Sequence, residues 1–199
     1  MNYPSSIKNL IECYKKLPGI GEKSAERLAL ATLDLDDDII DLFSDTVKNI
    51  QKRVRRCSIC NGLAEDEKCE ICKDPSRDHK LVCVVEEPKN VISLEKIGTY
   101  KGVYHVLDGL ISPLDGINPS DINIDSLINR IEKNDINEII IAVKPSIEGE
   151  TTTLYILKKL EGLDVIVSKI AHGIPLGADM EYIDSLTLEM ALEDRKKIS

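Results

Sequence analysis

The sequence has no tryptophan and a single phenylalanine among its 199 residues. Proteins that bind single-stranded nucleic acid without sequence preference commonly stack the bases on aromatic side chains. With so few large rings available, a stacking surface of that kind is not expected. The chain also lacks any apolar run near the ~20 residues that a transmembrane helix needs. We therefore expect no membrane-spanning segment.

The first sixteen residues, MNYPSSIKNLIECYKK, lack the basic start, apolar stretch and small-residue cleavage site of a secretory signal peptide. We therefore expect a cytoplasmic protein. In a reducing cytosol, the six cysteines are expected to be free or metal-bound instead of paired in disulfides.

Charge is distributed unevenly along the chain, although the net charge is −9. Residues 1–60 carry ten Lys and Arg against nine Asp and Glu, a balance of +1. Residues 61–199 carry sixteen against twenty-six, a balance of −10. A polyanion such as DNA should therefore contact the first third of the chain. The acidic remainder should face water or a basic partner.

Hydrophobic periodicity changes along the sequence and predicts a multi-element α/β protein. Helical spacing dominates the first third, and a cysteine-rich segment with little periodicity follows. Short β-branched runs then alternate with helical stretches, which predicts a mainly parallel sheet. The predicted strands are residues 81–87, 102–107, 138–143 and 164–170, and the predicted helices between and after them are 89–97, 124–134, 151–162 and 179–195.

Four cysteines form the most specific pattern in the chain. Cys57 and Cys60 make one Cys-x2-Cys pair, and Cys69 and Cys72 make a second pair after eight intervening residues. Two such pairs supply four sulfurs for one tetrahedral zinc ion, with no coordination position left for water. The alternative is four free cysteines in a loop. We favour one structural zinc per chain, because nothing else would order this segment.

The remaining cysteines and histidines carry weaker signals. Cys13 and Cys83 lie in apolar stretches and are expected to be buried, inert thiols. We expect His105 to be packed or partly exposed within a strand, and His79 to lie at the surface. His172 is expected to make a structural or partner contact, since no nucleophile is paired with it in a recognisable motif.

A second motif, LPGIGEKSAERLAL at residues 17–30, has two helices joined by a Pro-Gly-x-Gly turn. Gly19 and Gly21 allow backbone amides to approach a ligand closely, and the following helix N-terminus favours phosphate. Lys23 and Arg27 are four residues apart and so share one helical face. The pattern is that of a helix-hairpin-helix, which grips the sugar-phosphate backbone. The alternative is an ordinary helical hairpin whose glycines serve only as a cap.

Acidic residues follow two of the predicted strands. Glu86 and Glu87 end the first strand, and Glu148 and Glu150 follow the third. Ligands bind at the carboxyl ends of parallel strands, so we expect these side chains to gather there. Carboxylates so placed bind Mg²⁺ in nucleic-acid enzymes. The region resembles the Toprim domain of topoisomerases and primases. Where those enzymes carry a closely spaced Asp pair, however, this chain has Lys144.

The order of these motifs, with the segments CVVEEPKNV, YHVLDGLISPLDGI, SIEGETTTLY and AHGIPLGADMEY, resembles the RecR family from end to end. The resemblance implies a helix-hairpin-helix DNA-binding region at 1–54 and a four-cysteine zinc knuckle at 55–78. A Toprim domain at 79–174 and a C-terminal helical segment at 175–199, expected to form an oligomer contact, complete the chain. Family members usually have glycine where Asp108 stands and Asn-Pro-Thr at residues 144–146.

The resemblance also implies a function. A RecR-type protein is a tetrameric ring that encircles DNA and works with the RecO and RecF proteins to load RecA onto gapped DNA. We therefore expect a non-catalytic, cytoplasmic, nucleoid-associated scaffold whose acidic Toprim face docks RecO. The alternatives are a Mg²⁺-dependent nuclease or primase, and a zinc-dependent regulator that reads base edges. Lys144 in place of the Asp pair disfavours the first, and the lack of a recognition helix disfavours the second.

Overall fold

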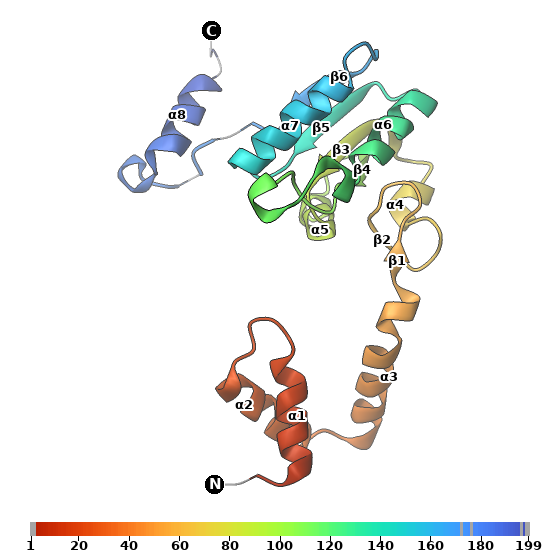
Figure 1. Cartoon of the computed structure of the whole chain (residues 1–199), viewed down its shortest axis with the longest axis vertical. Helices are drawn as coiled ribbons and strands as arrows, with labels where there is room; N and C mark the ends of the chain where they lie inside the picture. The colour runs from red at the N-terminus through yellow and green to blue at the C-terminus, as the bar shows by residue number, and fades with distance from the viewer. Residues whose placement is uncertain (1–2, 172, 176, 196, 198–199) are drawn as a thin grey trace. The chain divides into compact units, whose positions relative to one another are not determined.

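The computed structural model describes residues 3–171, 173–175, 177–195 and 197 (Figure 1). The chain forms two compact units, residues 1–53 and residues 54–199. Each unit has its own core, so each is described separately below.

The first unit is built from helices. Helices α1 (Ser5–Lys15) and α2 (Glu22–Thr32) pack against each other, with Ile11, Ala25 and Ala29 buried between them. Small alanines on α2 let the two helices approach closely, and Tyr14 Oη lies 2.8 Å from Thr32 Oγ1. Helix α3 (Asp37–Arg53) follows and buries none of its residues within the chain.

The second unit begins with a small knuckle of short elements. Strands β1 (Arg55–Arg56) and β2 (Leu63–Ala64) pair antiparallel, and helix α4 (Glu70–Lys73) follows. Its buried residues are mainly cysteines, not aliphatic side chains. Elements this short cannot be stable on a hydrophobic core alone, so the cysteine cluster must hold them.

A four-stranded parallel sheet forms the centre of the second unit. Its strands are β3 (Asp78–Val85), β4 (Gly102–Val106), β5 (Glu138–Ala142) and β6 (Ile166–Lys169), in the order β4-β3-β5-β6. The pairs β3–β4, β3–β5 and β5–β6 are all parallel. The expected mixed α/β architecture with a mainly parallel sheet is confirmed.

Alternate residues of the strands enter two different cores. Val82 and Val84 join the larger cluster, with side chains of α6 (Ile124–Lys133) and α7 (Ile147–Lys159), whereas Cys83 and Val85 join a smaller one beside α5 (Pro88–Glu95). Helices therefore cover both faces, as a buried parallel sheet requires. Short 3-10 turns occupy Pro113–Asp115, Pro119–Asp121 and Met180–Tyr182.

Two helices differ most in extent from the sequence prediction. Helix α7 begins at Ile147, four residues earlier than expected, because Ser146 caps it by accepting a hydrogen bond from the Gly149 amide at 3.2 Å. The C-terminal helix α8 covers only Ser185–Glu193. No described helix has the length and apolar character that a membrane span requires.

Candidate metal centre and nucleic-acid interface

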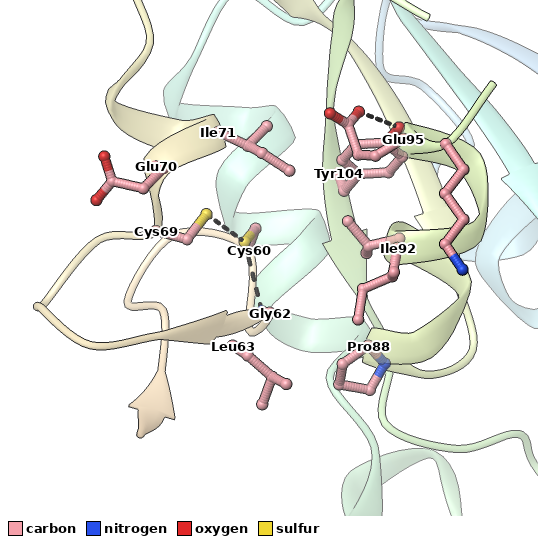
Figure 2. Close-up of a pocket in the computed structure, with 12 residues that line it drawn as sticks. Cys60, Gly62, Leu63, Cys69, Glu70, Ile71, Pro88, Ile92, Glu95 and Tyr104 are labelled. Atoms are coloured by element: carbon pink, nitrogen blue, oxygen red, sulfur yellow. Dashed lines mark hydrogen bonds between the residues drawn. The ribbon is translucent and has the colours of Figure 1, made fainter. Parts of the chain in front are cut away.

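The four cysteines of the knuckle come together in one cluster. Their sulfur atoms all lie within 4.8 Å of one another. Figure 2 shows Cys60 beside Cys69, with a sulfur–sulfur distance of 3.6 Å. A tetrahedral zinc site with ~2.3 Å bonds has sulfur–sulfur edges of about 3.8 Å. Cys57, Cys60 and Cys72 are buried and Cys69 is partly buried, so the donor set suits a closed structural site.

Backbone amides orient the sulfurs. The Gly62 amide donates to Cys60 Sγ at 3.4 Å, and the Cys69 amide donates to Cys57 Sγ at 3.3 Å. Such outer hydrogen bonds fix thiolate ligands in zinc sites. Glycine at position 62 leaves room for this contact, because a Cβ there would lie 3.2 Å from Cys60 Sγ, closer than an ordinary van der Waals contact. The backbone of the knuckle therefore holds the sulfur atoms of Cys57 and Cys60 in position.

The electrostatics of the cluster also favour a cation. The contact with Cys69 raises the pKa of the Cys60 thiol, and the same contact lowers the pKa of Cys69. Contacts with Cys60 and then Cys69 raise the pKa of Cys72. Four adjacent sulfurs can all be thiolates only when a cation offsets their charge.

Hydrogen bonds join the knuckle to edge strand β4. The Val106 amide donates to the Cys60 carbonyl at 2.8 Å, and Asn61 Nδ2 donates to the Val106 carbonyl at 3.1 Å. Beyond the strand, Arg56 Nη2 contacts both carboxylate oxygens of Asp108 at 2.7 and 2.9 Å. These contacts pair the Val106 end of this edge strand with the knuckle. The same knuckle and α5 enclose an apolar groove of about 510 Å³ (Figure 2).

The helical hairpin presents the predicted phosphate-binding residues to solvent. Gly19 has φ +80°, a conformation that favours glycine, and Gly21 is the N-cap of α2. Lys23 and Arg27 are exposed one turn apart on α2. Neither takes part in an ion pair with another described residue. The nearby Glu22 carboxylate is instead paired with Lys15 at 2.6 Å, which offsets its negative charge at the start of the helix.

The four glutamates at the carboxyl ends of the strands have different partners. Glu86 follows β3 and lies 3.9 Å from the Lys144 ammonium, and Glu87 caps α5. Glu148 accepts a hydrogen bond from Ser146 at 2.7 Å, which lowers the pKa of its carboxyl. Glu150 forms an ion pair with Lys169.

These glutamates do not form one multidentate site. Among the described residues, the cysteine quartet is the only group of three or more His, Cys, Asp or Glu whose ligand atoms lie within 4.8 Å. Lys144 stands beside Glu86, where a second carboxylate would be needed to hold Mg²⁺. The four carboxylates were expected to gather at the carboxyl ends of the strands. They lie in that region, but each has its own partner and they do not form one site.

Three of the weaker sequence predictions are settled by burial. Cys83 is buried and His79 is exposed, as expected. The prediction that Cys13 is buried is wrong: it is exposed, because it lies on the side of α1 opposite Ile11. His172 lies outside the described residues.

His105 is packed inside the protein, which agrees with one of the two expectations for it. It is only 1% exposed, with Nε2 at 2.9 Å from the Asn123 carbonyl oxygen. Burial lowers the pKa of its imidazole to about 4. The histidine is therefore a packed, neutral residue of the sheet.

Sequence reasoning missed the contacts that join segments far apart in the chain. The Arg56–Asp108 pair spans 52 positions, and no local pattern marks it. Gly149 was also missed: a Cβ there would lie 2.1 Å from the Lys144 carbonyl oxygen. Its signal was the Ser-x-x-Gly spacing at the start of α7.

The fold and the cysteine site together define a class: a zinc-finger protein that combines a helical hairpin with a parallel α/β domain. Four family models match consecutive parts of the chain. They are the RecR helix-hairpin-helix (residues 7–50), the RecR four-cysteine zinc finger domain (54–74), the Toprim domain (80–171) and the RecR C-terminal region (173–196).

A relative covers the entire length. The chain is 44% identical over 198 residues to "Recombination protein RecR" of Enterococcus faecalis, and the match spans 100% of both proteins. The chain therefore belongs to the RecR family of recombination proteins, and zinc is its cofactor.

Proposed function

We propose that this protein is a non-catalytic DNA-binding subunit of recombinational repair, acting at cytoplasmic, nucleoid-associated DNA. Together with RecO and RecF proteins, it helps to load RecA onto gapped DNA. The observation that carries the DNA-binding role is the exposed Lys23 and Arg27 pair beside the positive-φ turn at Gly19. Family membership supports the place in recombination.

The hairpin suits phosphate through its backbone as well as its charges. The first amides of a helix have no intrahelical acceptor, and Gly21 has no side chain with which to cap them. A phosphate oxygen can accept from these amides while Lys23 and Arg27 neutralise its charge. None of these contacts reads a base, so binding is sequence-independent.

Cys57, Cys60, Cys69 and Cys72 are the proposed ligands of one structural zinc per chain. The metal orders residues 55–78, and the Cys60 and Asn61 hydrogen bonds to Val106 transmit that order to β4. The zinc takes no part in chemistry, since four protein ligands leave no open position.

A salt titration tests the hairpin. Replacing Lys23 and Arg27 with Ala should lower the log–log slope of duplex affinity against salt by about 1.8, because each neutralised phosphate contributes ~0.9. Lys8→Ala with Lys16→Ala is the matched control, since both side chains are exposed on or beside α1 of the same unit. Wild-type slopes in the Lys23/Arg27 variant would show that the hairpin does not hold DNA.

The proposed RecO-docking face is the acidic region at the carboxyl ends of the strands, formed by Glu86, Glu87, Glu148 and Glu150. Separately paired carboxylates on a unit of negative charge attract a basic protein surface. Glu148→Gln with Glu150→Gln should weaken the RecO complex while leaving zinc content and hairpin-mediated DNA binding intact. Glu161→Gln with Asp164→Asn, beyond the far end of α7, removes the same charge as a control. Unchanged RecO affinity in the first variant would refute this assignment.

We also propose that the chain assembles as a homo-oligomer, a tetrameric ring, with residues 175–199 among its contacts. Large apolar side chains are exposed on helices that the single chain leaves uncovered: Leu42 on α3 and Leu186 and Leu192 on α8. Burying such side chains stabilises an assembly. Measuring the mass in solution, with and without DNA, tests the proposal, and a monomer at working concentration would contradict it.

A further inference from the structure

A groove of about 480 Å³ lies between the zinc knuckle and helix α6, wholly within the second unit. Ser58 and Ile59 of the knuckle form one wall. Lys80 at the start of β3 and Arg130 and Lys133 on α6 contribute the charged side chains. Three separate parts of the sequence therefore meet around one hollow, and two of them supply cations.

The charge of this groove is opposite to that of its surroundings. Lys80, Arg130 and Lys133 stand against one carboxylate, Asp135, which gives the lining a balance of +2 with His79 neutral. Residues 61–199 as a whole carry −10. A groove beside α8 is lined by three carboxylates and a single lysine, Lys169, a balance of −2. The positive groove is thus a local exception on an acidic unit.

The cations are arranged for an external anion. Arg130 is held in place because its Nη1 donates to the Tyr104 carbonyl at 2.7 Å, which leaves other guanidinium N–H groups to bind a ligand. Lys133 is exposed in the last turn of α6. The helix dipole stabilises these two cations, but it does not account for Lys80, which comes from another element and pairs with Asp135.

We propose that this groove is a second binding site for the phosphodiester backbone of DNA. Arg130 would take a phosphate through paired N–H donors, with Lys80 and Lys133 as flanking charges. Asn129 Nδ2 donates to the Asp125 carbonyl at 2.8 Å and has a second N–H to offer. No Phe, Tyr or Trp is among the described residues that line it, so it grips the backbone and stacks no base. This inference rests on the proposed DNA-binding function and extends it to the knuckle.

The first test removes charge from the groove of the full-length, zinc-loaded protein. Lys80→Gln with Lys133→Gln should lower the salt slope of binding to random-sequence duplex by about 0.9 to 1.8. Lys101→Gln with Lys158→Gln is the matched control, because both lysines are exposed in the same unit and neither lines the groove. The control should keep the wild-type slope.

The second test adds charge, so it does not depend on damage to the protein. Asp135→Asn removes the carboxylate that pairs with Lys80 and should tighten DNA binding and steepen the slope by up to about 0.9. Glu132→Gln, on α6 but outside the groove lining, makes the same charge change and should have no comparable effect.

The outcomes separate this inference from the function on which it rests. If Lys23/Arg27 variants flatten the slope while groove variants leave it unchanged, the groove site is wrong and the hairpin assignment stands. If none of them changes the slope, both fail. Equal responses to Asp135→Asn and Glu132→Gln would reduce the effect to net charge and overturn the proposal. Loss of a protein complex with an unchanged DNA slope would assign the groove to an acidic protein partner instead.

Discussion

Acidification should destabilise this protein through His105, and the size of the effect follows from its surroundings. Nε2 faces the Asn123 carbonyl and so carries the proton of the neutral ring. Nδ1 is the buried side-chain nitrogen that has no hydrogen-bond partner in the described structure. A second proton would therefore place a charge in a buried site without an acceptor, with Arg130 adding repulsion.

The sign and magnitude can be worked out from the pKa of His105. Its pKa is about 4 in the folded protein against an ordinary value of 6.5, so the unfolded chain binds the proton more tightly. The contribution of neutral His105 to the free energy of unfolding is complete above the pKa of the unfolded chain. It is lost as pH falls below that pKa, by about 1.4 kcal/mol per pH unit at most. Between about pH 7.5 and about pH 5, His105 alone should cost about 2 kcal/mol.

Urea unfolding of wild type and His105→Gln across this range tests the magnitude. Glutamine keeps a donor for the Asn123 carbonyl but does not titrate. The pH dependence of the zinc site is common to both proteins and cancels in their difference. The variant should show about 2 kcal/mol less loss of unfolding free energy on acidification. Equal losses in the two proteins would refute the assignment of His105 as a buried neutral group.

Three further predictions concern the knuckle and its contact with Asp108. Metal analysis should find one zinc per chain, and Cys60→Ala or chelation should expose residues 57–78 to protease; protease resistance of that segment in metal-free protein would contradict this. The Arg56–Asp108 pair should show a coupling energy of only about 0.2 to 1 kcal/mol in a double-mutant cycle, because the two side chains are 42% and 39% exposed. Asp108→Gly should also relieve the positive φ of +68°, so it should stabilise the Arg56→Gln background more than the wild type.

Features encoded within short segments could be predicted from the sequence. Cys57 to Cys72 span sixteen residues, so spacing alone indicated one metal site, and the cluster geometry fits it. The Gly19 turn and the alternation of strands with helices were also visible as local patterns. Such local patterns are reliable predictors because backbone geometry and the number of metal ligands determine these structures without contacts from distant residues.

Features that depend on distant partners could not be predicted. The separate placement of Glu86 and Glu150 depends on Lys144 and Lys169, which reach them only once the sheet has formed. The exposure of Cys13 depends on which face of α1 meets α2. The positive groove brings Lys80 of β3 together with Arg130 and Lys133 of α6, and only the i,i+3 spacing of the two α6 residues was visible in the sequence.

Incubating gapped duplex DNA with the zinc-loaded protein and Mg²⁺ tests the central claim, that the chain binds DNA without acting on it. Bound complexes should form while both strands stay intact, because Lys144 stands where a metal-binding carboxylate would be needed beside Glu86. Mg²⁺-dependent strand cleavage that is abolished by Glu148→Gln with Glu150→Gln would contradict this claim and assign catalysis to the acidic residues at the carboxyl ends of the strands.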